Sequence, residues 1–104
     1  MSEPPMSEPI EQRVQVDQSL SHLMPLFFDN RRELLDEAQT CCTSGDLDRL
    51  RGIGHNFKGA CGSYGFHQLS RFGEQLQYVD NLAEACDLVQ QMRRHLDQVV
   101  VEYV

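Results

Sequence analysis

Apolar residues recur at three- and four-residue intervals along most of this chain, and this pattern restricts its fold more than any other feature. Such spacing gathers apolar side chains on one face of an α-helix. The alternation typical of a half-buried strand occurs only in the valine-rich end, residues 99–104, and that segment also fits the last helical stripe. We therefore expect helices almost throughout.

Breaks in the apolar pattern separate five predicted helices. Pro25 suits the first turn of a helix, Thr43-Ser44-Gly45 is a stop signal, and Asp46 fits a helix N-cap. Gly65 ends the next stripe, and Asp80-Asn81 forms the last break. The predicted helices cover residues 16–23, 25–43, 46–65, 66–79 and 82–103.

These segments predict an all-α protein. Four amphipathic helices joined by short connections favour an antiparallel up-and-down four-helix bundle, with the short additional N-terminal helix covering one end. A chain of 104 residues suits one domain, which we place at residues 16–104. Residues 1–15 contain Met-Ser-Glu-Pro twice and few apolar side chains, so we expect a flexible N-terminal tail there.

The charge balance excludes several classes of function. A net charge of −7 argues against binding to nucleic acid or to a membrane surface, since both need broad basic patches. No apolar run is long enough to insert into a bilayer, and the N-terminus lacks the basic start and apolar centre of a signal peptide. We expect a cytoplasmic, monomeric protein.

Four cysteines occur at positions 41, 42, 61 and 86. They include no C-x-x-C pair, and the adjacent Cys41 and Cys42 cannot bridge each other without strain. In a reducing cytosol such residues mostly act as small buried apolar side chains. We therefore expect free cysteines.

The chain's only lysine, Lys58, stands three residues after His55 and directly before Gly59. Residues three apart in a helix lie on the same side, one turn from each other. On a helical wheel the core-forming Ile53 and Phe57 lie opposite His55, so its imidazole should face solvent. The arrangement predicts an exposed nucleophile beside a cation, which suits a phosphorylated histidine.

Glycines and basic residues add to this prediction. Gly52, Gly54, Gly59 and Gly62 fall within one predicted helix, where each costs about 1 kcal/mol relative to alanine. We expect Gly54 to allow close helix packing, and Gly59 and Gly62 to leave the exposed side bare for a phosphoryl group. No acidic residue occurs from position 49 through 73, which predicts a basic island of Arg49, Arg51, Lys58 and Arg71.

The stretch from His55 to Gly65 has the form H-x-x-K-G-x-x-x-x-x-G. It resembles the signature of histidine-containing phosphotransfer (HPt) domains, in particular the C-terminal HPt modules of hybrid sensor kinases. The five-helix plan of residues 16–104 is similar to the family's architecture. The resemblance implies a phosphorelay phosphocarrier that takes a phosphoryl group from a receiver-domain aspartate and passes it to another.

The resemblance also implies roles for individual residues. His55 would be the phosphoryl acceptor and donor, Lys58 would stabilise the phosphate, and Gly59 would give steric clearance. Gln77 would orient the imidazole, and Arg51 and Gly62 would support the site. The partners would be response-regulator receiver domains, which supply Mg²⁺, and a hybrid sensor kinase. The chain itself would bind no cofactor or metal, and without a G-x-x-x-x-G-K-[ST] motif it would not be an ATP-using enzyme.

Two other functions remain open from the sequence. One is a helical interaction module whose histidine is never phosphorylated. The other is a metal-binding bundle that uses His22, His67, His95 and the cysteines, although the Glu-x-x-His pairs of di-iron bundles are absent.

Overall fold

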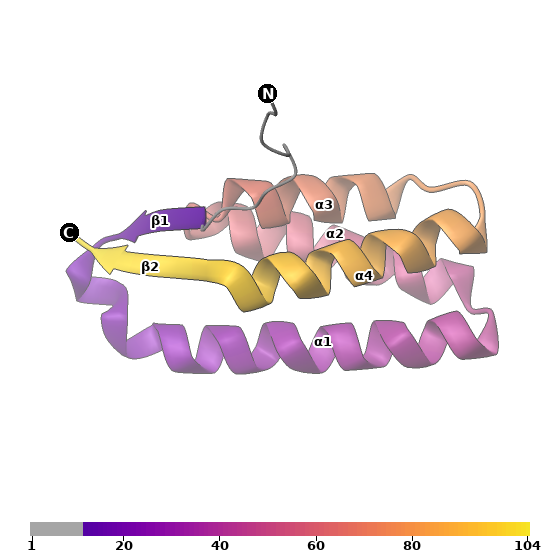
Figure 1. Cartoon of the computed structure of the whole chain (residues 1–104), viewed down its shortest axis with the longest axis horizontal. Helices are drawn as coiled ribbons and strands as arrows, with labels where there is room; N and C mark the ends of the chain where they lie inside the picture. Colours follow the sequence, from indigo (N-terminus) through magenta and orange to yellow (C-terminus); the bar gives the residue numbers. More distant parts are fainter. Residues whose placement is uncertain (1–11) are drawn as a thin grey trace, which may run out of the picture.

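The computed structural model describes residues 12–104, which are mostly helical. Figure 1 shows the α-helices lying lengthwise beside one another, with the strands at the end where the last helix finishes. Within this part of the chain, no helix is both long and apolar enough to cross a membrane. The elements are β1 (Gln12–Val16), the 3₁₀ helix η1 (Gln18–Leu23), α1 (Met24–Ser44), α2 (Leu47–Ser63), α3 (His67–Gln77), α4 (Leu82–Gln98) and β2 (Val99–Tyr103).

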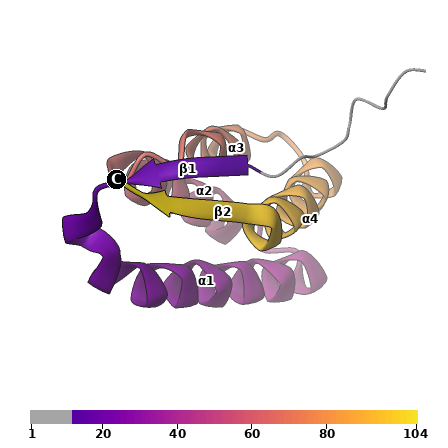
Figure 2. The same ribbon diagram turned by 60° about the vertical axis from the view of Figure 1, so that its left-hand side comes forward.

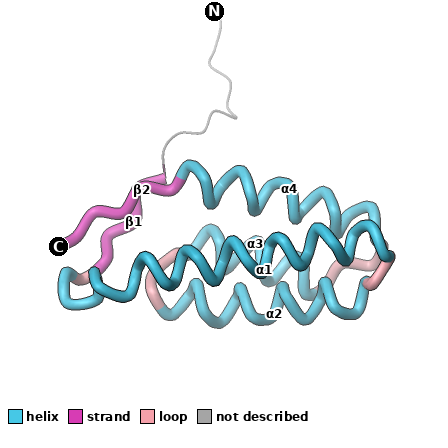
Figure 3. Tube along the Cα trace, turned by 90° about the horizontal axis from the view of Figure 1, so that it is seen from below, coloured by secondary structure: helices cyan, strands magenta, loops and turns pink. Residues whose placement is uncertain are grey.

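Local sequence signals account for where the helices begin and end, and the short loops between them are visible in Figure 3. Gly45 ends α1 with a φ of +79°, a left-handed conformation that glycine adopts without a steric penalty. The Asp46 carboxylate then accepts a hydrogen bond from the Arg49 backbone N–H and caps α2. Asn81 caps α4 in the same way through the Glu84 N–H. The predicted breaks at 43–46 and 80–81 are therefore confirmed.

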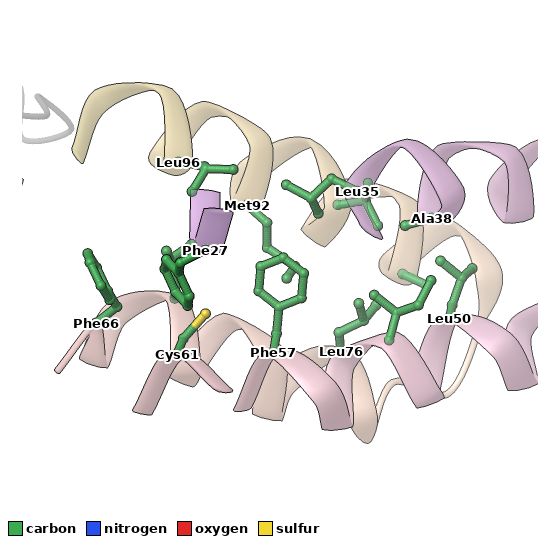
Figure 4. Packing of buried hydrophobic residues seen from close by; sticks show 14 of the residues in the cluster. Phe27, Leu35, Ala38, Leu50, Phe57, Cys61, Phe66, Leu76, Met92 and Leu96 are labelled. Carbon is green, nitrogen blue, oxygen red and sulfur yellow. The ribbon is translucent and has the colours of Figure 1, made fainter. Parts of the chain in front are cut away.

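The apolar stripes of the four helices meet in one core, part of which is shown in Figure 4. Phe27 of α1 stacks on Phe66 with ring centroids 5.0 Å apart and meets Tyr64 edge to face. This contact closes the core beside the strands. The fully buried apolar side chains of the helices include Leu35, Ala38, Leu50, Ile53, Phe57, Cys61, Leu69, Leu76, Ala85, Val89 and Met92.

The prediction of an all-helical chain is wrong at both ends. β1 and β2 form a parallel two-stranded sheet, as Figure 2 shows. Gln12 lies opposite Val99, and Val16 opposite Tyr103. Residues 12–15 had been assigned to the flexible tail, and 99–103 to the last helix. Three consecutive valines favour an extended backbone once a partner strand is present. Residues 1–11, the rest of the predicted tail, lie outside the described residues.

The first predicted helix, 16–23, is present as the 3₁₀ helix η1 and begins two residues later. The Asp17 carboxylate accepts a hydrogen bond from the Ser19 N–H, 3.3 Å away, and caps it. Val16 belongs to β1 and is buried. The turn η1 thus leads the chain from the sheet into α1.

The cysteine prediction is right for two residues and wrong for two. Cys41 and Cys61 are free and buried. Cys42 of α1 and Cys86 of α4 form a disulfide, with their Cα atoms 5.7 Å apart. The two residues are separated by 44 positions in sequence, so only the packing of α1 against α4 brings them together.

Candidate functional site

His55 lies in the middle of α2, with its side chain exposed. Ile53 and Phe57, which the helical wheel places opposite it, are fully buried. The exposure of the imidazole thus agrees with the sequence pattern. Because the remainder of the turn is anchored in the core, the ring stands on a rigid helix.

Gln77 at the end of α3 reaches this imidazole. Its amide nitrogen Nε2 lies 3.0 Å from Nδ1 of His55, which is a hydrogen-bonding distance. The other end of the amide, Oε1, is buried and has no hydrogen-bond partner among the described residues. The structure therefore brings together two of the residues that the resemblance selected, from helices that are separate in sequence.

A close contact between two glycines sets the distance between α2 and α3. A Cβ atom added to Gly54 would lie 2.6 Å from the Gln77 backbone nitrogen and 2.7 Å from the Gly73 oxygen. One added to Gly73 would lie 2.6 Å from the Lys58 nitrogen. The two helix backbones therefore touch, which confirms close packing at Gly54. Gly73 was missed, although a glycine inside a predicted helix was a signal for it.

Lys58 leans towards α3, where it meets an acidic residue that sequence reasoning also missed. Its Nζ lies 3.8 Å from Oε2 of Glu74, and the Lys58 side chain is 43% exposed. Glu74 stands just beyond the acid-free window of residues 49–73. Glu74 and Gln77 are three residues apart in α3, so they lie on the same side of this helix.

The predicted basic island is largely neutralised by other elements. Arg49 binds Glu37 of α1, with Nη2 2.9 Å from Oε1, and this ion pair lowers the pKa of Glu37. Arg51 donates two hydrogen bonds, of 3.0 and 2.7 Å, to the Val79 carbonyl oxygen after α3. Of the four basic residues in this island, Arg71 alone is exposed without a hydrogen bond or ion pair to another described residue. The window held no acids, but the neighbouring helices supply them for Arg49 and Lys58, and Asp48, directly before the window, lies 3.6 Å from Arg51.

The two glycines expected to leave the surface bare differ from each other. A Cβ on Gly59 would meet no atom within 4 Å, so this position is open. A Cβ on Gly62 would lie 3.2 Å from Ser70 Oγ, so Gly62 serves packing against α3. Ser70 in turn donates a hydrogen bond to the Lys58 carbonyl oxygen at 2.8 Å.

A buried cation, Arg31 of α1, lies under the turn next to His55 and was not predicted. Its guanidinium carbon is 4.7 Å from the centroid of the Phe57 ring, and Nη1 donates to Asn56 Oδ1 at 2.8 Å. Cation–π contact and the hydrogen bond together stabilise a charge that is only 7% exposed. Arg31 thereby ties the residue after His55 to α1.

The residues of the metal-binding alternative do not converge. His22 is exposed on η1. His67 and His95 line one cavity of about 590 Å³ beside β1, and burial lowers the pKa of His95. Among residues 12–104, no three histidine, cysteine or acidic side chains lie close enough together to hold a metal ion.

Comparison with known proteins identifies the family. A family model described as "Hpt domain" matches residues 22–102, which is most of the chain and includes α1 to α4. Comparisons with curated proteins and with solved structures gave no match. The match and the exposed histidine on a helical scaffold agree with each other, and the chain belongs to the Hpt domain family.

Proposed function

We propose that this chain is a phosphorelay phosphocarrier that accepts a phosphoryl group on His55 from a receiver-domain aspartate and passes it to another receiver aspartate. Membership of the Hpt family implies a phosphocarrier role in general. The observation that carries the finer proposal is the exposed His55 ring, held at Nδ1 by Gln77 and flanked by Lys58. We also propose that α1 to α4 form an antiparallel up-and-down bundle.

Gln77 selects the nitrogen that reacts. Nδ1 of His55 is occupied by the amide, which leaves Nε2 as the nitrogen open to a partner. A half-turn of the amide places the unpartnered Oε1 against Nδ1, where it accepts a hydrogen bond from the Nδ1–H. Neutral imidazole carries one proton. When this proton is on Nδ1, the lone pair of Nε2 is free to attack.

The transfer itself needs little from this chain. The Nε2 lone pair attacks the phosphorus of an aspartyl phosphate, the P–N bond forms, and the P–O bond to the aspartate breaks with its electron pair. The receiver regains its carboxylate, and the reverse step loads the next receiver. The receiver provides Mg²⁺ for the charge on the phosphoryl oxygens, and Lys58 adds one positive charge from this side.

Lys58 has to exchange partners during this cycle. In the resting protein its ammonium faces Glu74 at 3.8 Å, a long and partly exposed ion pair that contributes little to stability. A phosphoryl group on Nε2 brings nearly two negative charges to the same surface and attracts the ammonium away from Glu74. Gly59, which has open space beside it, leaves room for the phosphoryl group and the partner's backbone.

The partners we propose are response-regulator receiver domains and a hybrid sensor kinase, in the cytoplasm. The phosphoryl group originates on the kinase, so this chain acts without an ATP site of its own. In a reducing cytosol Cys42 and Cys86 would be held as thiols, since glutathione keeps most cytosolic cysteines reduced.

Transfer from a phosphorylated receiver tests the proposal. A receiver is loaded with acetyl phosphate and Mg²⁺, separated from the donor and mixed with the chain. We expect an acid-labile, alkali-stable phosphate on the chain, and none on His55→Gln with its helical circular dichroism retained. A wild-type chain that stays unlabelled with receivers that load other Hpt proteins would favour the non-phosphorylated interaction module.

Variants of Gln77 test its part in the site. Gln77→Glu keeps an acceptor for the Nδ1 proton, whereas Gln77→Leu of similar size has none. We expect transfer to fall up to about tenfold in Gln77→Leu, because one lost hydrogen bond costs about 1 kcal/mol, and to fall less in Gln77→Glu. Equal rates in Gln77→Leu and wild type would show that the amide does not select the reacting nitrogen.

A further inference from the structure

One edge of β2 presents unpaired backbone groups. The Val104 N–H donates to the Val16 oxygen and the Val104 oxygen accepts from the Gln18 N–H, both at 3.0 Å, so both groups of Val104 point towards β1. Backbone groups of successive residues in a strand point to alternate sides. Those of Val101 and Tyr103 therefore point away from β1, and no other described strand pairs with that edge.

The same strand carries exposed apolar side chains. Among the described residues, five large apolar side chains are exposed, and three of them belong to β2 or directly follow it. These are Val100, Tyr103 and Val104, at 40, 45 and 65% exposed. An open edge with exposed valine and tyrosine is a template on which another strand can pair.

We propose that this edge pairs with the same edge of a second copy of the chain, so that two β1–β2 units form one four-stranded sheet. Antiparallel pairing of two β2 strands about a two-fold axis at Val101 is self-complementary. It places Val101 opposite its own copy, in a pair that exchanges both N–H···O bonds. Tyr103 then lies opposite Val99, and Glu102 opposite Val100, so no two carboxylates face each other.

Charge limits where a second copy can approach, and the sheet is such a place. The whole chain carries a net charge of −7, so two copies repel each other over most of their surfaces. The only charged residues of the two strands are Arg13 and Glu102, and they form an ion pair with Nη1 2.8 Å from Oε2. The sheet is therefore a neutral, apolar site on an acidic molecule, and a strongly basic or acidic partner would find no counter-charge there.

This surface lies partly outside the family pattern. The Hpt match spans residues 22–102 and leaves out β1, without which β2 would have no partner in the fold. The expected monomer took no account of a sheet, because the sequence analysis predicted none. Because strands of five residues bury little area, the association should be weak, with a dissociation constant of about 0.1 to 1 mM.

Sedimentation equilibrium from about 20 µM to 1 mM tests the dimer, since this range brackets the expected dissociation constant. We expect the wild-type average mass to rise towards twice the monomer mass. Val101→Pro removes an outward N–H, which an edge strand tolerates. Val100→Glu sets a carboxylate opposite Glu102 of the other copy, and like charges directly opposite destabilise a strand pair. Both should stay monomeric at every concentration. Leu26→Glu, the same type of change at an exposed position of α1, should associate like wild type.

Amide hydrogen exchange of the wild-type chain is a second test, and it does not depend on the folding of any variant. In the monomer the amides of Val100 and Glu102 should be protected by β1, and those of Val101 and Tyr103 should exchange fast. At high concentration protection should appear at Val101 and Tyr103. A wild type that remains monomeric at 1 mM, or a dimer that persists in Val100→Glu, would overturn the proposal; so would concentration-independent exchange at Val101.

Discussion

At the scale of single residues, the site combines a pattern visible in the sequence with partners that only packing supplies. The spacing of His55, Lys58 and Gly59 on one helix, and the exposure of His55, follow from helical periodicity. Glu74 could not be identified as the partner of Lys58, because its contact depends on the angle and register between α2 and α3. The same holds for Arg31, whose burial against Phe57 gives no local signal.

Glu74 should shorten the lifetime of the phosphorylated state. It competes with the phosphoryl group for Lys58 and repels the added negative charge. We expect Glu74→Gln to slow hydrolysis of phospho-His55 by about two- to fivefold, the size expected for an exposed ion pair. The measurement is the decay of radiolabel on the isolated phosphoprotein. Glu33→Gln, the same exchange on α1, should leave the decay unchanged, and a faster decay in Glu74→Gln would contradict this role.

Cys61 should make the fold sensitive to alkaline pH. Burial raises the pKa of its thiol from 9.0 to about 11. The unfolded chain loses this proton above about pH 9 and the folded chain keeps it, so the free energy of unfolding falls as pH rises through that window. Two pKa units correspond to roughly 2 to 3 kcal/mol. Urea titrations at pH 8 and 11 should show a smaller loss in Cys61→Ala, and equal losses would be the contrary result.

At the scale of elements, helix boundaries were readable and helix contacts were less so. Gly45, Asp46 and Asn81 mark ends that local backbone chemistry dictates. The Gly54–Gly73 contact was half predicted, since one glycine had been assigned to packing and its partner had not. Strand β2 was missed because its three valines fit a helix as well as a strand until β1, far away in sequence, is known to lie beside it.

The α2–α3 contact predicts opposite effects for two similar substitutions. Gly54→Ala would press a methyl group against the backbone of Gly73 and Gln77, and should lower the free energy of unfolding by about 2 to 3 kcal/mol. Gly59→Ala enters open space and should raise it by up to about 1 kcal/mol through helix propensity. Urea denaturation followed by circular dichroism measures both. Equal destabilisation of the two variants would mean that the helices are not in backbone contact at Gly54.

At the scale of the whole molecule, two connections join segments that are far apart in the sequence. The sheet joins residues 12–16 to residues 99–103, and the disulfide joins the C-terminal part of α1 to the first turns of α4. Neither could be predicted, because pairing between distant segments depends on the assembled bundle. The bundle's composition of four amphipathic helices could be predicted, since each helix carries its own apolar stripe.

The disulfide should stabilise the protein only under oxidising conditions. Closing a loop between positions 44 apart restricts the unfolded chain, and the expected gain is about 3 to 4 kcal/mol. Oxidised wild type should therefore unfold at higher urea concentration than protein reduced with dithiothreitol. Cys42→Ser should give one midpoint under both conditions. A wild-type midpoint that does not respond to reductant would contradict the link between α1 and α4.

The position of the phosphoryl group on the His55 ring is the most direct test of the account. Phosphorus NMR of the chain after transfer from a phosphorylated receiver distinguishes phosphate on Nε2 from phosphate on Nδ1, and mass spectrometry of peptides locates the residue. We predict a single phosphohistidine at position 55, carried on Nε2, because Gln77 occupies Nδ1. Phosphate on Nδ1, or on any histidine other than His55, would contradict it.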